Sequence, residues 1–579
     1  MGDSVQTFYE LYGEAAGKAL QARHSEFKGL QHASPEAAAI EYNRAVPKQA
    51  RHALGEFFTP PWLADLVLDR LDYRGQADLL DPSAGLGVFV DRARSRGGQA
   101  FGYEINPVTS ACARAMGLPV ETRDTLCDPG ERRFSFIAGN PPWVNWRNIH
   151  SHYRERIKPL WERYDLLPKG RLGGAMDDLS MLFTYLCADR LLAGGGKLGL
   201  LLPRTLFQSA GGGRQFRRFE LPGGRFIRVL SVEEIAGVSA FAEANTQAVL
   251  GIFESGPHRT IYPVAYFRGA ERWTAEPVSQ DPASAWAIRR NSSSPMTRMR
   301  GRSEYAARVG VHSGGASGVY WVDVLERNGA TVVIRNRADS GKNKWATVTA
   351  EVESDLVRPL IRGRDVKRWH AVSTHAVIAP HSEDGRPITH DSMATQYPLA
   401  YAYFEHFREP MLERPHYLQH FAPRRWPYWS MYNVGPYTFA THRVVWKEQS
   451  LKFECALMPD ERSIPDAKLT LVACRSADEA RYLAVALNSP PAREFIESYA
   501  VRTQISTHVL RNLCVPQFDP QNELHCELAR HYGATDDNLE RLARQLWGEH
   551  PSAPPEITQP EHEWVHSHEV PSVPREDPL

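Results

Sequence analysis

Between about residues 78 and 254, short apolar runs alternate with stretches whose apolar residues recur at helical spacing. The runs are bounded by glycine and polar residues, as strands usually are. Strands that alternate with helices need crossover connections, which place the strands parallel to one another. The pattern therefore predicts a doubly wound α/β domain, with candidate strands at residues 78–80, 100–103, 134–138, 197–202, 226–230 and 246–253.

Three helix signals accompany this alternation. Residues 1–50 are rich in alanine, with apolar residues at helix-like intervals, and predict an N-terminal helical segment. Thr59 is a candidate N-cap for a helix from Trp62 to Leu71, with the intervening prolines in its first turn. An apolar helix from Leu179 to Leu192 is expected to end at the following glycines, because glycine accepts the left-handed conformation.

The rhythm changes after about residue 258 to irregular sequence rich in aromatic residues and arginine. This predicts one or two α+β units that serve recognition. The last residues are rich in Pro, Glu and His and bury too little apolar area to offset chain entropy. The predicted organisation is a helical segment (1–50), the α/β domain (51–258), a recognition region (259–545) and a disordered acidic tail (546–579).

Composition narrows the class of protein. The chain has 579 residues, and its 68 Lys and Arg balance its 68 Asp and Glu, so net charge gives no argument for nucleic acid. Its seven cysteines form no CxxC pair, which argues against a zinc cluster or a disulfide framework, and no metal is expected. No window resembles a targeting sequence or a membrane span, so a cytoplasmic enzyme that does not bind membranes is expected.

A glycine-bearing turn follows the first candidate strand. It reads Asp81-Pro82-Ser83-Ala84-Gly85-Leu86-Gly87-Val88-Phe89, in which Gly85 and Gly87 allow a tight turn and a close backbone approach to a ligand. The GxGxxG dinucleotide fingerprint is absent. Glu104 stands at the end of the next strand, where a carboxylate can accept from two ribose hydroxyls, and Asp124 could accept from an adenine amino group.

Three acidic side chains at successive strand ends suit a ligand that carries ribose, adenine and a positive sulfonium. They would repel the pyrophosphate of a dinucleotide. S-adenosylmethionine therefore fits better than NAD, and the Thr59 hydroxyl with the helix N-terminus after it is a candidate partner for the methionine carboxylate. Taken singly, Glu104 and Asp124 can also be ordinary caps or surface charges.

A second motif, Asn140-Pro141-Pro142-Trp143, follows the strand at residues 134–138. The Asn140 side-chain oxygen and the Pro141 carbonyl can each accept one hydrogen of an exocyclic amine and draw its lone pair out of the ring. Trp143 can stack on the face of an extruded base. A proline-rich turn after a strand is the alternative, but the full tetrad is much less common. The two motifs together indicate methylation of a planar amino group.

These motifs resemble those of the gamma-class N6-adenine DNA methyltransferases of type II restriction-modification systems, over about residues 51–255. The resemblance implies a Rossmann-like methyltransferase domain with a C-terminal α+β target-recognition domain, and it makes Asn140, Pro141, Pro142 and Trp143 the catalytic tetrad. In that family the commonest tetrad has Tyr or Phe where Trp143 stands. The cofactor-binding residues expected on these grounds are Thr59, Pro60, Asp81, Ser83, Gly85, Gly87, Phe89, Glu104, Ile105, Asp124 and Asn140.

Substrate-binding candidates are fewer. Phe241 lies in a segment that resembles the one whose aromatic packs against the target base in the family, and Trp143 would stack on the same base. Arg424 and Arg425 lie in the aromatic and basic stretch 417–446, which suits phosphate contact and base stacking but equally suits an aromatic core edged by cations. Arg214, followed by Arg217 and Arg218, could clamp phosphates or belong to an ordinary exposed basic helix. Residues 360–369, 483–489 and 503–506 resemble the family's specificity region.

Three functions stay open. A DNA adenine methyltransferase with double-stranded DNA as partner, acting alone or with other subunits of a restriction-modification or phage-defence system, agrees with the long region after residue 258. A protein-glutamine or ribosomal-RNA methyltransferase uses a similar tetrad, but such enzymes are generally more compact. A methylation-cleavage fusion would need a nuclease domain, for which only about 50 residues precede Phe58.

Overall fold

The computed structural model describes residues 9, 17, 21, 33–46, 48, 51, 55–167, 178–209, 213–235, 247–290, 299–341, 343–450, 452–500, 505 and 507–548. The chain divides into two compact units, Met1–Ser293 and Ser294–Leu579. Residues 546–548 of the predicted tail (546–579) are helical, so its predicted start is wrong; residues 549–579 and most of the predicted N-terminal helical segment lie outside the described residues.

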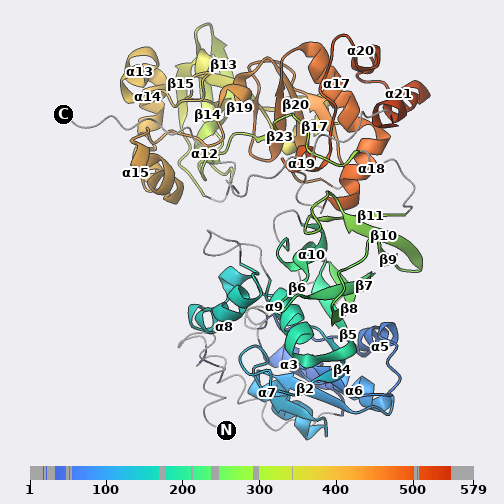
Figure 1. Cartoon of the computed structure of the whole chain (residues 1–579). Coiled ribbons are helices and arrows are strands. Elements are labelled where there is room, and N and C mark those ends of the chain that lie inside the picture. The colour runs from blue at the N-terminus through green and yellow to red at the C-terminus, as the bar shows by residue number, and fades with distance from the viewer. Residues whose placement is uncertain are drawn as a thin grey trace, which may run out of the picture. The chain divides into compact units, whose positions relative to one another are not determined.

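The first unit contains one 11-stranded sheet whose order is β11-β10-β9-β7-β8-β5-β4-β1-β2-β3, with β6 paired to β7 (Figure 1). The strands from β3 to β5 are parallel, whereas β8 is antiparallel to both of its neighbours. The doubly wound α/β fold predicted from the apolar pattern is confirmed. The strands are β1 Leu79–Asp81, β2 Ala100–Glu104, β3 Val120–Thr122, β4 Phe134–Gly139, β5 Leu192–Pro203, β6 Glu220–Leu221, β7 Arg225–Ile235, β8 Ala248–Gly256, β9 Val264–Arg268, β10 Glu271–Pro277 and β11 Trp286–Arg289.

Helices cover both faces of this sheet. Side chains that follow one another along a strand point to opposite faces, so each strand contributes apolar residues to both helical layers. In β1, Leu79 belongs to the apolar cluster that includes α5 and α6, whereas Leu80 belongs to the cluster that includes α8 and α9. The helices are α3 Pro35–Ala45, α5 Pro61–Arg70, α6 Val88–Ser95, α7 Pro107–Ala115, α8 Ser151–Arg163, α9 Leu179–Leu186 and α10 Thr205–Gln208.

Several element boundaries differ from those predicted. The N-cap of α5 is Pro60 and the helix has no side-chain cap hydrogen bond, so the cap predicted at Thr59 is wrong. α9 ends at Leu186 and continues as a π-helical turn, after which β5 begins at Leu192, earlier than the glycines expected to end the helix. These glycines lie instead where the register of β5 against β4 shifts. β9, β10 and β11 extend the sheet beyond residue 258.

The second unit is an α+β structure, as predicted. It holds a six-stranded sheet (β15-β14-β13-β19-β16-β22), a four-stranded sheet (β12-β23-β20-β21) and the pair β17-β18. Its strands are β12 Arg308–Val309, β13 Trp321–Asn328, β14 Thr331–Asn336, β15 Thr349–Glu353, β16 Val357–Ile361, β17 Val366–Lys367, β18 His370–Ala371, β19 His375–Ile378, β20 His442–Lys447, β21 Cys455–Leu457, β22 Ile464–Pro465 and β23 Leu469–Cys474.

Most of the described helices of the second unit lie in two parts of the sequence, between β19 and β20 and after β23. Those after β23 include α17, which is buried along most of its length. The helices are α12 Ser317–Tyr320, α13 His390–Gln396, α14 Pro398–Glu405, α15 Arg408–Leu412, α16 Pro436–Phe439, α17 Ala477–Asn488, α18 Pro490–Tyr499, α19 Val509–Asn512, α20 Glu523–Arg530 and α21 Asp537–Gly548.

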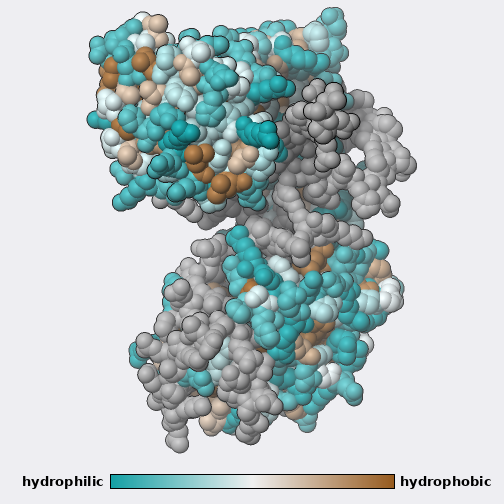
Figure 2. Space-filling model, turned by 90° about the vertical axis from the view of Figure 1, so that its left-hand side faces the viewer, coloured by the Kyte–Doolittle hydropathy of each residue, from teal (hydrophilic) through white to brown (hydrophobic). Residues whose placement is uncertain are grey.

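On the face drawn in Figure 2, hydrophobic residues form small separate patches among hydrophilic ones. Within the described part of the chain, every helix is either too short or too polar to cross a membrane.

Candidate active site

Two adjoining cavities lie in the first unit at the carboxyl ends of β1, β2 and β4, where ligands bind in open α/β sheets. Their volumes are about 140 Å³ and about 40 Å³. Residues from the glycine turn and from the start of the Asn-Pro-Pro-Trp tetrad therefore face the same space. The residues that line both cavities are Phe57, Phe58, Ser83, Gly85 and Asn140.

Asp81, the last residue of β1, stabilises the turn that follows this strand. This buried carboxylate accepts from the Ser83 backbone N–H at 3.1 Å, and burial raises the pKa of Asp81 to about 8. Gly85 and Gly87 have φ values of +54° and +87°, which residues with a side chain rarely adopt. A Cβ at Gly87 would also lie 2.8 Å from the Leu118 side chain. The two glycines thus allow the predicted tight turn, and their close approach to a ligand stays a prediction.

Glu104, at the end of β2, fixes the same turn from its other side. One carboxylate oxygen accepts from the Gly85 N–H at 2.6 Å and the other from the Asn106 N–H at 2.7 Å. Glu104 is buried, and burial raises its pKa above the ordinary value for a glutamate. Each carboxylate oxygen has a further lone pair with which it can accept from a ligand hydroxyl.

Asp124 follows β3 and presents its two oxygens differently. Oδ1 accepts from the backbone N–H groups of Leu126 and Cys127, at 3.1 and 3.2 Å, and from the Tyr153 hydroxyl at 3.0 Å. Oδ2 is buried and has no hydrogen-bond partner among the described residues. The adjacent Thr125 hydroxyl donates to the Pro82 carbonyl at 2.6 Å and ties this loop to the glycine turn. Asp124 lines the larger cavity with one acceptor to spare.

Asn140 is arranged in the same way. Its amide nitrogen donates to the Phe57 carbonyl at 3.0 Å, and the Ser83 hydroxyl donates to its backbone carbonyl at 3.3 Å. Its side-chain Oδ1 is buried and without a partner among the described residues. A buried acceptor that makes no hydrogen bond is costly, and such groups often mark a place that a ligand completes.

Trp143 is half-buried and fixed in position. Its indole Nε1 donates to the Leu201 carbonyl at 3.3 Å, and its ring centroid lies 6.2 Å from that of Phe57. Trp143 is not among the described residues that line either cavity, although Pro142 and Val144 on each side of it line the larger one.

Besides Tyr153, three polar residues that the sequence reasoning missed complete the site. Glu56 lines the larger cavity and accepts from the Tyr42 hydroxyl of α3 at 3.1 Å and from the Asn106 amide at 2.9 Å. Burial raises the pKa of Glu56 to about 7, and Glu104 adds to the same effect. Asn106 therefore holds two carboxylates at once, since its backbone N–H donates to Glu104.

Of the eleven expected cofactor residues, nine line the two cavities and two lie outside their lining. Pro60 and Gly87 do not line either cavity, and neither does Pro141 of the tetrad, within the residues that the structure describes. Phe241 lies outside the described residues. Besides Asn140, the lining contains Thr59, Asp81, Ser83, Gly85, Phe89, Glu104, Ile105 and Asp124.

The basic residues singled out from the sequence differ in their placement. Arg214 pairs with Asp281. Arg217 is 1% exposed and donates to the carbonyls of Leu206, Ser209 and Ala283, so it is a structural residue and neither alternative considered for it holds.

In the stretch 417–446 of the second unit, Arg424 and Arg425 are exposed. The indoles of Trp429 and Trp446 are fully buried and Arg443 is 1% exposed, so much of this stretch is core. Thr503, Gln504 and Ser506 of the last specificity-like segment lie outside the described residues.

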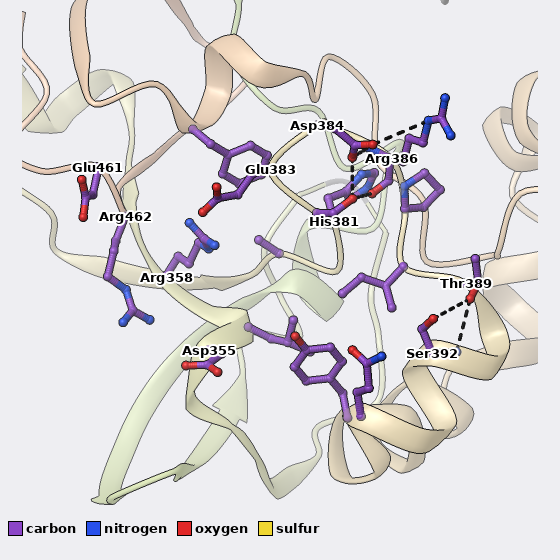
Figure 3. Close-up of a pocket in the computed structure, with 18 of the residues that line it drawn as sticks. Asp355, Arg358, His381, Glu383, Asp384, Arg386, Thr389, Ser392, Glu461 and Arg462 are labelled. Carbon is purple, nitrogen blue, oxygen red and sulfur yellow. Dashed lines mark hydrogen bonds and ion pairs between the residues drawn. The ribbon is translucent and has the colours of Figure 1, made fainter.

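A larger cavity of about 840 Å³ lies in the second unit (Figure 3). Its lining mixes Arg358, Arg386 and Arg462 with four carboxylates from Asp355, Glu383, Asp384 and Glu461. His381 in its wall is buried and its Nε2 accepts from the Met431 N–H at 3.0 Å, so this ring is neutral and structural. No pattern in the sequence predicts this cavity.

The donor and acceptor set of the two first-unit cavities fits S-adenosylmethionine. The unpartnered Asp124 Oδ2 offers an acceptor for an amino group, and Glu104 offers acceptors for ribose hydroxyls. Phe58, Ile105 and Phe183 add apolar walls. Burial raises the pKa of Glu56, Asp81 and Glu104 and so reduces their negative charge, which means that the positions of the acceptors, and not charge repulsion, carry the fit.

Comparison with known proteins gives partial relatives. No family model matches the sequence. The chain is 24% identical over 173 residues to the type II methyltransferase M.CvrRI of Paramecium bursaria Chlorella virus XZ-6E, which is 29% of this chain and 41% of that protein. It is 24% identical over 186 residues to the type II methyltransferase M.HincII of Haemophilus influenzae, which is 31% of this chain and 34% of that protein. The matches thus span less than half of either relative.

Among solved structures, the type IIL restriction-modification enzyme MmeI in complex with DNA has a similar fold. The TM-score is 0.54 at 12% sequence identity, over 90% of this chain and 80% of that one. The resemblance to restriction-modification methyltransferases seen in the sequence motifs is confirmed by these similarities. The gamma class and the target atom stay predictions.

Proposed function

We propose that this chain is a DNA methyltransferase of a restriction-modification system, which transfers a methyl group from S-adenosylmethionine to N6 of an extruded adenine. The observation that carries the proposal is the unpartnered, buried Oδ1 of Asn140, which lines a cavity together with the glycine turn. The proposed amine acceptor and the proposed cofactor loop thus line the same cavity. The names of the curated relatives and the residues of the tetrad support the same substrate class.

The reaction needs positioning more than it needs an acid or a base. S-adenosylmethionine supplies, when bound, a methyl group on a positively charged sulfur. The adenine amine forms a bond to the methyl carbon, the carbon–sulfur bond breaks with its electron pair left on sulfur, and a proton leaves the amine for solvent. In-line geometry of this kind accounts for much of the lowering of such barriers.

Asn140 has the central role in this scheme. Its Nδ2 is anchored on the Phe57 carbonyl, so the Oδ1 atom is held in one direction and can accept one amine hydrogen. The Pro141 carbonyl is the proposed acceptor for the second hydrogen. Two acceptors favour a pyramidal nitrogen, whose lone pair is available for attack. Trp143, fixed through Leu201, is the proposed stacking partner of the base.

The proposed cofactor contacts use residues that line the two cavities. Glu104 is proposed to accept from ribose hydroxyls and Asp124 from the adenine amino group. Thr59 and Phe89 line the smaller cavity beside the glycine turn, where the methionine part is proposed to lie. In the second unit, Arg424 and Arg425 are proposed to contact phosphates of double-stranded DNA.

The proposal is tested by incubating the full chain with methyl-tritiated S-adenosylmethionine and, separately, duplex DNA, ribosomal RNA and a bacterial protein extract. Label in DNA, recovered as N6-methyladenine after nucleoside digestion, is expected. Asn140→Ala should abolish this labelling, whereas Asn148→Ala, at a nearby exposed asparagine, should retain it. Label that appears only in RNA or protein would contradict the proposal.

A further inference from the structure

Asp124 has an asymmetric set of hydrogen-bond partners, which its own loop explains only in part. Oδ1 accepts three hydrogen bonds, two from the backbone of its loop and one from the Tyr153 hydroxyl of α8, while Oδ2 makes none among the described residues. Both Asp124 and Tyr153 line the larger cavity. The carboxylate is therefore oriented, with one oxygen saturated by the protein and the other left for a ligand.

We infer that Tyr153 is a positioning residue that makes Asp124 select the 6-amino group of the cofactor's adenine. The inference rests on the proposed use of S-adenosylmethionine. Tyr153 is 8% exposed, and burial raises its pKa well above the ordinary value, so the hydroxyl keeps its proton and donates to Oδ1 at every physiological pH. Oδ2, which can only accept, then favours an amino group over a carbonyl at the same position of a purine.

The place of Tyr153 in the chain gives this contact a second consequence. α8 begins at Ser151, only a few residues after the tetrad, and Ile149 and His150 before it also line the cavity. Thr125, next to Asp124, is bonded to the Pro82 carbonyl of the glycine turn. The Tyr153 hydrogen bond therefore joins the segment that follows the tetrad to the loop of Asp124, which is proposed to bind the adenine of the cofactor.

The orientation makes an unusual prediction for Asp124→Asn. Because three donors point at Oδ1, the amide oxygen of the asparagine should take that position and the amide nitrogen should replace Oδ2. A donor would then face the cavity in place of an acceptor. The variant should prefer a purine with a 6-carbonyl over one with a 6-amino group.

The test uses calorimetric titration of the full chain with S-adenosyl-L-homocysteine and with S-inosyl-L-homocysteine, which carries a carbonyl in place of the amino group. The wild-type chain is expected to prefer the adenosyl ligand. Tyr153→Phe should narrow this preference by about fivefold, since it removes only the hydroxyl that orients the carboxylate. Asp124→Asn should invert the preference, and adding Tyr153→Phe to it should weaken the inversion.

Tyr164→Phe is the matched control. Tyr164 lies at the end of the same helix and its hydroxyl donates to Asp189 at 3.1 Å, but neither residue is among the described residues that line the cavity. This variant should lose a similar buried hydrogen bond and keep the wild-type preference.

The outcomes separate this inference from the proposed function. Failure of the wild-type chain to bind either ligand would contradict the proposed cofactor. A wild-type chain that discriminates, with the same preference in Tyr153→Phe or an equal loss in Tyr164→Phe, would overturn the role of Tyr153. If Tyr153→Phe does not fold, an uninverted preference in Asp124→Asn would overturn it.

Discussion

Glu56→Gln should change how the stability of the first unit depends on pH. Glu56 is partly buried beside the glycine turn and shares the Asn106 side chain with the Tyr42 hydroxyl. Burial raises the pKa of Glu56 from 4.5 to about 7, with Glu104 acting in the same direction and the hydrogen bonds from Asn106 and Tyr42 opposing it. The glutamine keeps an acceptor for Asn106 and removes the titrating group.

The magnitude follows from the two pKa values of Glu56. Since the folded chain holds this proton more tightly than the unfolded chain, the stabilisation is fully present below pH 4.5 and is lost as the pH rises through about 7. The gap between the two values corresponds to about 3 kcal/mol. About 2.5 kcal/mol of this is lost between pH 5 and pH 8. The neutral amide of Glu56→Gln has no such dependence.

The assay is urea unfolding of the cofactor-free chain at pH 5, 6, 7 and 8, followed by circular dichroism. Relative to the wild-type chain, Glu56→Gln should gain about 2.5 kcal/mol in free energy of unfolding from pH 5 to pH 8. Glu162→Gln, at an exposed position of α8, is the control and should lose stability in parallel with the wild type. A parallel loss in Glu56→Gln as well would refute the reasoning.

Three further substitutions test other parts of the account. Asn140→Ala should lower methyl transfer to DNA by at least about 100-fold. Its affinity for S-adenosyl-L-homocysteine, measured by calorimetry, should stay within about threefold of the wild-type value. An equal loss of transfer and affinity would indicate a folding role. Arg217→Met should lower the free energy of unfolding by about 3 kcal/mol, because three buried carbonyls lose their donor. DNA affinity in gel-shift titrations should be unchanged. Weakened DNA binding would show that Arg217 contacts phosphate. The double variant Arg424→Ala with Arg425→Ala should reduce the slope of log affinity for DNA against log salt by about 1 to 2; an unchanged slope would remove this stretch from the interface.

The sequence predicted the central strands and the glycine turn because both are local signals. Apolar runs of strand length between helices have few other interpretations, and Gly85 and Gly87 occupy left-handed conformations that favour glycine. All six candidate strands are present. β9 to β11 continue the sheet through hairpins and parallel pairing that the change of rhythm after residue 258 concealed.

The missed site residues have partners far along the chain. Tyr153 is 29 residues from Asp124, and Asn106 is 50 residues from Glu56. Periodicity and spacing carry no information on such pairs. Composition likewise could not show that the aromatic and basic stretch 417–446 combines core residues such as Trp429 with exposed residues such as Arg425, because burial depends on contacts with distant parts of the chain.

The central claim is that Asn140 accepts a hydrogen bond from an adenine amine of duplex DNA and positions it next to a methyl donor bound beside the glycine turn. It is tested most directly by sequencing, with detection of modified bases, of DNA from cells that express either the wild-type chain or Asn140→Ala. N6-methyladenine at one recurrent sequence, present only with the wild-type chain, is the predicted result. DNA without modified adenine in both cultures, or with the same modification in both, would contradict the claim.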